Sequence, residues 1–243
     1  YNDLVSSLDD KVVDMQHKLE ADIIRRDYVR HTQETVDLDY VIERQTYMEK
    51  NFVDFCKVKI GQYSDWRWAG VEINPSTGMF TESMLGSDPL YIMEKQIIDV
   101  ESVKQRFNKF FVDKRMMFYS SYDDLPQGQI GVASCINLFD FWPIDYIKEE
   151  MRSIMSILAP GGHLIFSYND CEIQQSLDLC AGHESYKAFN TKTLMEALAG
   201  SLGYDIIDSG LMNYTDSWMV VKKPGALTTH KLSAPLVSID KNI

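Results

Sequence analysis

The sequence has few of the residues that build metal sites or disulfide-stabilised domains. Its four cysteines include no Cys-x-x-Cys pair, and no histidine lies at metal-ligand spacing from them. We therefore predict free thiols, no metal site and a reducing, cytoplasmic compartment. Apolar runs are also short, and none approaches the roughly 18 residues that a membrane-spanning helix needs. The sequence thus predicts no contact with a membrane.

Positive charge is scarce as well. The chain has 24 Lys and Arg against 36 Asp and Glu, which gives a formal net charge of −12, and it has no local basic patch. Because such a chain repels phosphate backbones, we expect no nucleic-acid partner. Hydrophobic residues, in contrast, make up 45% of the 243 residues. That length and composition predict a globular protein with a sizeable core.

Proline and glycine are missing from the first 60 residues. Apolar residues there recur at steps of three and four, which predicts one face of a helix, and a second helical segment is expected from about residue 38 to residue 58. Residues 1–60 are therefore interpreted as a helical extension. It is either a cap on the following domain or an arm for homo-oligomerisation, and the sequence leaves both open. The first of the two helical faces consists of Leu4, Leu8, Val12, Met15, Leu19 and Ile23.

From residue 66 onward, candidate strands alternate with candidate helices. This alternation predicts an α/β domain over residues 61–223, with a doubly wound, mostly parallel seven-stranded sheet. The last two strands are joined by a loop, which predicts an antiparallel hairpin strand at the C-terminal end of the sheet. Residues 224–243 lack periodicity and are expected to be an irregular tail. The candidate strands are Ala69–Ile73, Pro89–Met93, Arg115–Tyr119, Ile130–Ile136, Gly162–Tyr168, Tyr204–Gly210 and Ser217–Val221; the candidate helices are Thr81–Leu85, Gln96–Phe110, Ile144–Leu158 and Thr191–Leu202.

Residues 68–94 carry the most information about function. A buried strand ends at Glu72, a tight turn and a short helix follow, and a second strand ends at Glu94. This order is typical of the nucleotide-binding half of a doubly wound sheet, in which an acid about 20 residues downstream takes the two ribose hydroxyls. The turn from Glu72 to Gly78 has one glycine where such turns usually have three. No Gly-x-Gly-x-x-Gly exists in the sequence, which disfavours a dehydrogenase.

Six segments in order, within residues 66–223, resemble the class I S-adenosylmethionine-dependent methyltransferases, with a degenerate glycine-rich first motif. The most typical of them is a helix that ends in Leu-x-Pro-Gly-Gly and is followed by an apolar strand. The segments are VEINPSTGMFT, LYIME, SSYDDLP, IGVASCINLFDFW, ILAPGGHLIFSYND and FNTKTLMEALAGSLGYDIID. The resemblance implies a Rossmann-like fold, S-adenosylmethionine as cofactor and S-adenosylhomocysteine as product.

The resemblance also implies roles for the first turn. Glu72 is expected to hold the ammonium end of the cofactor's methionine part, and Pro75 rigidifies the turn. Asn74 replaces the usual first glycine, and asparagine tolerates positive φ better than other residues with a side chain. Ser76 replaces the middle glycine, where its side chain would either crowd the methionine part or hydrogen-bond to it. Gly78 is retained where a helix and a strand pack closely.

Three further groups of residues complete the implied site. Glu94 is expected to accept both ribose hydroxyls, a task suited to a carboxylate. The residues expected beside the adenine depart from the family's common Gly-Asp-Ala pattern, and they are Ser121, Tyr122 and Asp123. The residues expected under the transferring methyl group are Ser134 and Cys135. The family often has an aspartate near the start of that strand, where this chain has Gly131.

The implied reaction is an in-line displacement, in which the protein mainly aligns the acceptor with the methyl group. No catalytic residue is assigned, although four residues lie in or near segments that could face the acceptor: Asp140, His163, Asp170 and His183. The sequence signatures of DNA-base methyltransferases are absent, which favours a small-molecule, sugar or peptide acceptor. The alternative is a methyltransferase-like fold without activity that serves as an interaction or structural module.

Overall fold

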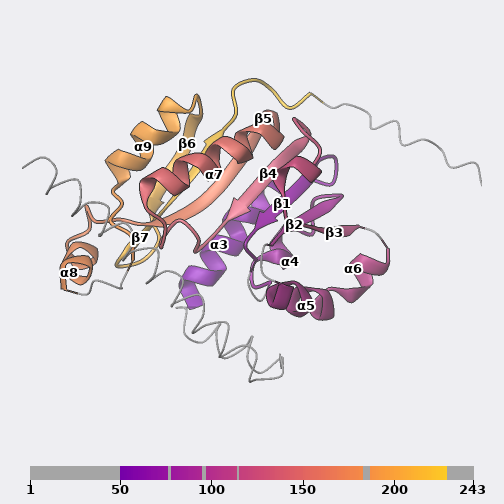
Figure 1. Ribbon diagram of the computed structural model, residues 1–243, viewed down its shortest axis with the longest axis horizontal. Helices are drawn as coiled ribbons and strands as arrows, with labels where there is room; N and C mark the ends of the chain where they lie inside the picture. The colour runs from indigo at the N-terminus through magenta and orange to yellow at the C-terminus, as the bar shows by residue number, and fades with distance from the viewer. Residues whose placement is uncertain (1–49, 76–77, 95–96, 114, 183–186, 229–243) are drawn as a thin grey trace, which may run out of the picture.

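A seven-stranded sheet forms the centre of the computed structural model, which describes residues 50–75, 78–94, 97–113, 115–182 and 187–228 (Figure 1). The strand order is β3-β2-β1-β4-β5-β7-β6. The first five strands in this order run parallel, and β7 is antiparallel to both β5 and β6. The predicted doubly wound sheet with an antiparallel C-terminal hairpin is thereby confirmed. The strands are β1 (Ala69–Ile73), β2 (Leu90–Met93), β3 (Met116–Tyr119), β4 (Ile130–Cys135), β5 (Leu158–Asn169), β6 (Asp205–Leu211) and β7 (Asp216–Lys222).

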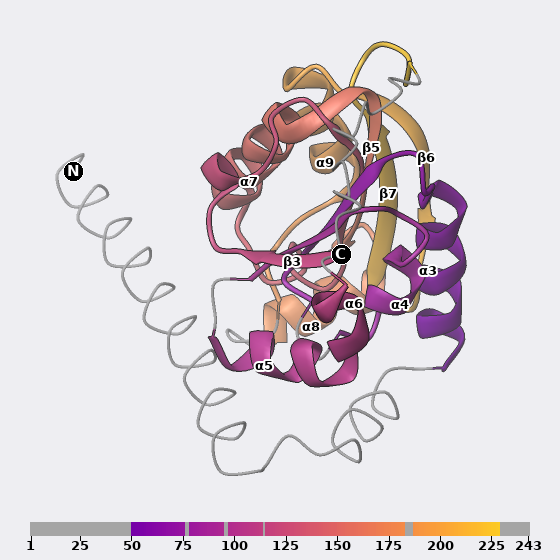
Figure 2. The same ribbon diagram turned by 90° about the vertical axis from the view of Figure 1, so that its right-hand side faces the viewer.

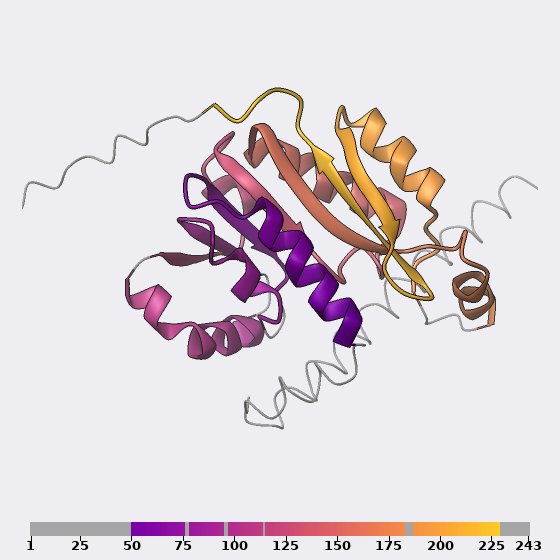
Figure 3. The same cartoon turned by 180° about the vertical axis from the view of Figure 1, so that it is seen from behind.

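Helices cover both faces of the sheet. The core beneath one face contains residues of α3, α4 and α5, and the core beneath the other contains residues of α7 and α9. Figure 2 shows the two layers on either side of the sheet, and Figure 3 shows the indigo helix α3 from behind, running roughly along the strands. None of the described helices is long and apolar enough to cross a membrane. The helices are α3 (Lys50–Tyr63), α4 (Thr81–Met84), α5 (Ile97–Arg106), α6 (Asn108–Val112), η1 (Tyr122–Asp124, a 3₁₀ turn), α7 (Ile144–Ile157), α8 (Gln174–Gly182) and α9 (Lys192–Ser201).

Helix α3 is the described part of the predicted N-terminal extension. Its buried residues are Val53, Cys56 and Ile60. At its end, the Tyr63 ring lies against the His163 ring of β5, with 4.7 Å between the ring centroids. This part of the extension therefore packs on the sheet. The rest of the extension, residues 1–49, lies outside the described residues, and so does most of the tail, so the choice between cap and oligomerisation arm stays a prediction.

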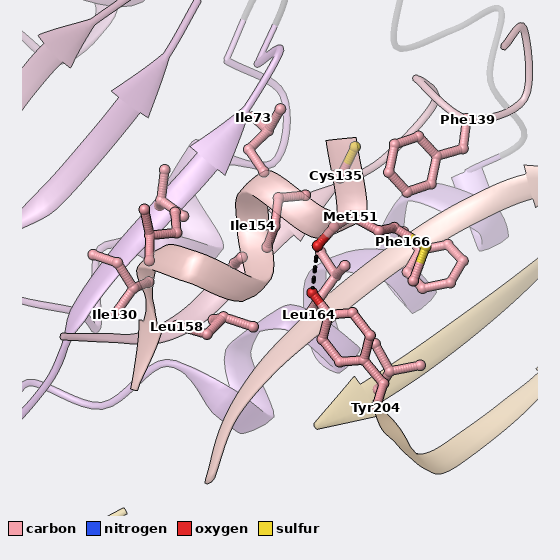
Figure 4. Close-up of a cluster of buried hydrophobic side chains, with 14 of the residues drawn as sticks. Ile73, Ile130, Cys135, Phe139, Met151, Ile154, Leu158, Leu164, Phe166 and Tyr204 are labelled. Atoms are coloured by element: carbon pink, nitrogen blue, oxygen red, sulfur yellow. Dashed lines mark hydrogen bonds between the residues drawn. The ribbon is translucent and has the colours of Figure 1, made fainter. Parts of the chain in front are cut away.

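Helix α7 supplies most of the core on its side of the sheet. Its buried side chains recur at steps of three and four residues, and Met151 and Ile154 are fully buried against the strands (Figure 4). The hydroxyl of Tyr204 donates a 2.8 Å hydrogen bond to the carbonyl oxygen of Met151, drawn as a dashed line in Figure 4. Burying an aliphatic side chain of this size stabilises the fold by about 1.5–3 kcal/mol. The apolar stripe on this helix is thus what fixes it on the sheet.

The Pro-Gly-Gly segment lies where α7 passes into β5. Gly161 has a φ of 81°, and its N–H donates to the carbonyl oxygen of Lys223 at 2.9 Å. A Cβ atom at Gly161 would lie 2.4 Å from the backbone nitrogen of Leu227. Only glycine fits this close approach between chain segments. The motif is at the amino-terminal end of β5, so its role is architectural and it lies at the opposite end of the strand from any site at the carboxyl edge.

Candidate functional site

The carboxyl ends of β1 and β4 lie side by side at the topological switch point, where the order of successive strands in the sheet reverses. Strands β2 and β3 lie on one side of β1, and β4 and β5 lie on the other. In doubly wound sheets, ligands bind in the crevice at such a switch point. In the strand register, Glu72 of β1 lies beside Ile92 of β2 and Ser134 of β4. Neighbouring residues in parallel register point to the same face, so Glu72 and Ser134 lie side by side.

Glu72 is a buried carboxyl group with an exposed fraction of 3%. Burial raises its pKa to about 7, and the charge of Glu94 adds to this effect. The hydroxyl of Thr81, which donates a hydrogen bond to Glu72 Oε2, and the guanidinium of Arg106 both oppose the rise. The pKa therefore lies near neutrality, and a nearby positive charge would favour loss of the proton.

Two of the described residues in the turn after β1 adopt the left-handed backbone conformation. Asn74 has a φ of 53°, as its place in the position of a glycine predicts, and its N–H donates to the carbonyl oxygen of Met93 at 2.9 Å. Gly78 has a φ of 75°, and a Cβ there would meet the Phe107 ring at 3.1 Å. Pro75 is buried, and its carbonyl oxygen accepts a 2.9 Å hydrogen bond from the Gly78 N–H. The turn is therefore tightly folded at both of its described ends. Ser76 lies outside the described residues.

Ser134 carries a polar atom that no other described residue pairs with. The side chain is 1% exposed, and its Oγ has no hydrogen-bond partner among the described residues. Leaving a buried hydroxyl unpaired costs about 1–3 kcal/mol. Glu94, at the end of the neighbouring strand β2, is also buried, with 6% of its surface exposed. The edge of the sheet at β1, β2 and β4 therefore carries three buried polar side chains, with unused hydrogen-bonding capacity on Ser134.

The next three predicted residues follow one another in the turn after β3, but their side chains point in different directions. The Ser121 hydroxyl accepts a 3.2 Å hydrogen bond from the Asp123 N–H and begins the η1 turn, and Asp123 is exposed. The Tyr122 hydroxyl instead donates to Glu150 of α7, and burial together with that carboxylate raises the pKa of the tyrosine. Tyr122 thus ties this turn to α7.

Cys135 points away from Ser134. Its side chain is fully buried in the core beneath α7, close to Phe139 and Met151 (Figure 4). Burial raises the pKa of the thiol well above its ordinary value. Successive residues of a strand face opposite sides of the sheet, so the two side chains lie on opposite faces. Of this pair, only Ser134 lies beside Glu72.

Several known structures with a similar arrangement of strands and helices are methyltransferases. The N-methyltransferase NodS from Bradyrhizobium japonicum, in complex with S-adenosyl-L-homocysteine, has a TM-score of 0.54 at 13% identity, over 71% of this chain and 88% of NodS. The magnesium protoporphyrin IX methyltransferase ChlM from Synechocystis, with the same ligand bound, has a TM-score of 0.54 at 12% identity, over 70% of this chain and 81% of ChlM. The chain has the class I methyltransferase fold.

A third match extends this likeness. An O-methyltransferase family protein from Burkholderia thailandensis has a TM-score of 0.58 at 8% identity, over 77% of this chain and 59% of that protein. No protein-family model matches the sequence, and no curated protein matches it either. The likeness therefore lies in the three-dimensional arrangement, which agrees with the resemblance seen in the six sequence segments.

One departure from the methyltransferase pattern has a structural reason. Gly131 stands near the start of β4, where the family often has an aspartate. A Cβ at this position would lie 2.5 Å from the Cβ of Trp68, closer than any real contact. The glycine therefore makes room for the Trp68 side chain at the amino-terminal half of the strand.

The four residues that the sequence offers as an acceptor-facing base differ in their surroundings. His163 lies within β5 against Tyr63, and burial lowers its pKa. Asp170 holds the local backbone, since its Oδ1 accepts from the N–H groups of Glu172 and Lys192 at 3.1 Å. His183 lies outside the described residues. No group of three or more His, Cys, Asp or Glu side chains within the described ranges is arranged to hold a metal ion.

Asp140, the last of the four candidates, is a buried acid. It follows β4, is 1% exposed, and its Oδ2 accepts a 2.7 Å hydrogen bond from the Ser167 hydroxyl. Burial raises its pKa to about 7, with Asp216 adding to the rise and Lys187 opposing it. Sequence reasoning did not include Thr81, Arg106 or Ser167, which bear on these acids. Their roles depend on contacts between distant segments, for which the sequence carries no local signal.

Proposed function

We propose that this chain binds S-adenosylmethionine at the carboxyl edge of β1, β2 and β4 and transfers its methyl group to a small-molecule, sugar or peptide acceptor. The observation that carries the proposal is the Ser134 hydroxyl, which no described residue pairs with, beside the buried carboxyl group of Glu72. A buried hydroxyl without a partner indicates a place where a polar ligand completes the hydrogen bonding. The likeness to methyltransferases that bind S-adenosylhomocysteine supports the same ligand class.

Each side chain of the proposed site has a task suited to its chemistry. Glu72, with its pKa near 7, faces the ammonium group of the cofactor's methionine part, and the Ser134 hydroxyl donates to a polar atom of the same part. Glu94 accepts the two ribose hydroxyls. The adenine lies beside the turn that begins at Ser121 and includes Asp123. Asn74, Pro75, Ser76 and Gly78 form the bend on which the methionine part rests. Tyr122 and Cys135 are left out because the Tyr122 hydroxyl donates to Glu150 and the Cys135 side chain is buried beneath α7.

When bound, the cofactor supplies a methyl group on a sulfonium, which is an excellent leaving group. The chain then has to hold the acceptor in line and exclude water. No residue need act as a nucleophile, and a base is needed only for an acceptor that holds its proton tightly. The net charge of −12 and the lack of a basic patch favour an uncharged or cationic acceptor over a nucleic acid.

A second candidate function is an interaction module without catalysis. The bonds that the site already makes internally favour it, since Thr81 donates to Glu72 and Arg106 donates to the carbonyl oxygen of Gly78 at 3.0 Å. The loss of two of the three usual turn glycines points the same way. In that case the chain would keep the architecture and bind no cofactor.

Titration of S-adenosylhomocysteine by calorimetry tests the proposal. We expect micromolar binding that Glu94→Ala weakens about 100-fold or more, because two charge-assisted hydrogen bonds are lost. Glu101→Ala is the matched control, since Glu101 is an exposed acid of α5 paired with Lys104 and should leave binding unchanged. Absence of binding at millimolar ligand by a folded protein would favour the interaction module.

A further inference from the structure

Two of the four cysteines lie in direct contact. Cys171 follows the end of β5, Cys180 belongs to α8, and their Sγ atoms are 3.6 Å apart. The other two cysteines are buried elsewhere, Cys56 in α3 near Met212 and Cys135 beneath α7. We propose that Cys171 and Cys180 are a redox-active pair that a hydroperoxide converts into a disulfide. This inference does not depend on the proposed methyl transfer.

The surroundings hold the two thiols face to face. The side-chain amide of Asn169 donates to both sulfur atoms, at 3.4 Å to Cys171 and 3.3 Å to Cys180. The same amide donates to the carbonyl oxygen of Ala188 at 2.9 Å. Cys171 is buried, whereas Cys180 is half-buried on the helix. An oxidant from solvent therefore reaches the Cys180 sulfur first, and the Cys171 sulfur lies beneath it.

Helix α8 can make the small movement that bond formation requires. Ser176 is its only buried residue, and the hydroxyl of Ser176 donates to Asn169 Oδ1 at 2.8 Å. The helix is thus held by polar contacts instead of an apolar face. A disulfide needs the sulfur atoms at about 2.05 Å, roughly 1.5 Å closer than the two thiols now lie. Elements with little apolar burial are the ones that move locally at low cost.

The chemistry balances with the hydroperoxide as the only co-reactant. The Cys180 thiolate attacks the peroxide, so that an S–O bond forms, the O–O bond breaks, and water or an alcohol leaves with the proton of the thiol. The sulfur of Cys171 then attacks the resulting sulfenic acid, so that the S–S bond forms, the S–O bond breaks and a second water leaves. The two thiols lose two electrons, and the peroxide gains them. Burial and the contact with Cys180 raise the pKa of Cys171 to about 11, which keeps this thiol protonated and leaves the first attack to the more exposed Cys180.

The disulfide would fix a segment that reaches the carboxyl edge of the sheet. Cys180 contacts the carbonyl oxygen of Lys187 at 3.6 Å, and the N–H of Ala188 donates to the carbonyl oxygen of Asp140 at 2.9 Å. In Figure 1, α8 lies beyond the end of β5 toward which β1 and β4 also point. Oxidation would therefore lock α8 and residues 187–190 against the loop that follows β4.

Peptide mapping of the full chain tests the proposal directly. Reduced protein is treated with a few equivalents of hydrogen peroxide and then denatured in the presence of N-ethylmaleimide, which alkylates any free thiol. A glutamate-specific endoprotease then cleaves the chain after Glu172, between the two cysteines. We expect peptides 151–172 and 173–184 to be joined, lighter by two hydrogen atoms than their sum, and to separate with dithiothreitol. Cys56→Ser is the matched control and should leave the joined peptides unchanged. Cys180→Ser should abolish them.

A second measurement reads the structural effect. Amide exchange within α8 should slow about tenfold on oxidation, because the bond holds the helix in place. Alkylation of both Cys171 and Cys180 after peroxide treatment of protein that is still folded would overturn the proposal. So would a disulfide to Cys56 or Cys135, or oxidation of Cys180 to a sulfinic acid without a linked product.

Discussion

The buried carboxyl group of Glu72 predicts that pH acts on stability and on cofactor binding in opposite directions. Its pKa is raised from 4.5 to about 7, first of all by burial. Between these two values the folded chain holds a proton that the unfolded chain has lost. The folded state therefore binds more protons, so stability falls as pH rises through this window. A ligand with a positive ammonium group instead favours the ionised form, so affinity rises with pH.

The raised pKa sets the size of both effects. A shift from 4.5 to about 7 corresponds to about 3 kcal/mol of unfolding free energy, present below pH 4.5 and lost by pH 7. If only ionised Glu72 binds the cofactor, the apparent dissociation constant is multiplied by a factor. This factor is one plus the ratio of protein with Glu72 protonated to protein with Glu72 ionised. This factor is close to one at pH 8 and about ten at pH 6. Binding should thus weaken about tenfold over these two pH units.

Glu72→Gln separates the two effects while keeping an acceptor for the Thr81 hydroxyl. We expect the variant to bind S-adenosylhomocysteine weakly and with no dependence on pH between 6 and 8, measured by calorimetry. Its unfolding free energy, measured in urea at pH 5 and pH 7.5, should depend less on pH than that of the wild type. Asp140→Asn is the control, because the pKa of Asp140 is also raised to about 7 and adds a slope of the same sign to stability alone. A wild-type affinity that is constant from pH 6 to pH 8 would refute the placement of Glu72 against a cation.

Two further predictions concern stability. Gly131→Ala should lower the unfolding free energy by about 1–3 kcal/mol, because the new Cβ meets Trp68. Gly200→Ala, on the open face of α9, should instead raise the unfolding free energy by about 0.5 kcal/mol. Equal effects of the two changes in urea unfolding would contradict this prediction. Lys223→Ala should cost about 1–2 kcal/mol, because its ammonium group donates to two carbonyl oxygens at the end of α7 at 2.8 and 2.7 Å. The neighbouring surface pair of Lys222 is longer, at 3.6 Å, so thermal unfolding of Lys222→Ala should match the wild type.

Most of the fold could be predicted from the sequence because the strands are short apolar runs separated by helical patterns. The differences arise where tertiary contacts decide. Strand β5 begins at Leu158, four residues before the predicted start, because Leu158 already pairs with Ile130 of β4. The predicted helix from 96 to 110 divides at Phe107, whose buried ring packs against Gly78. Helix α8 was not predicted, since a helix that buries only Ser176 has no apolar stripe to detect.

For the candidate site, the sequence predicts the positions of the residues along the strands and only some of their side-chain directions. Residues at strand ends, such as Glu72 and Glu94, follow from the order of strands and turns alone. The direction of Tyr122 depends on Glu150, which lies 28 residues away in sequence and comes close only in the folded chain. Alternation along β4 already implied that Ser134 and Cys135 face opposite sides, so this distinction was available from the sequence. It follows that the burial of Cys135 on the α7 side of the sheet could have been expected from the placement of Ser134 beside Glu72.

Ser134→Ala distinguishes a working site from an inherited scaffold. The Ser134 hydroxyl is buried without a hydrogen-bond partner among the described residues, which costs about 1–3 kcal/mol. Removing it should therefore raise the unfolding free energy by about 1 kcal/mol. If the hydroxyl contacts the cofactor, the same change should weaken binding of S-adenosylhomocysteine about tenfold, so stability and affinity would move in opposite directions. Greater stability with unchanged affinity would exclude Ser134 from the site. Greater stability in a chain that binds no cofactor would indicate that this sheet edge keeps a destabilising buried hydroxyl although it no longer binds a ligand.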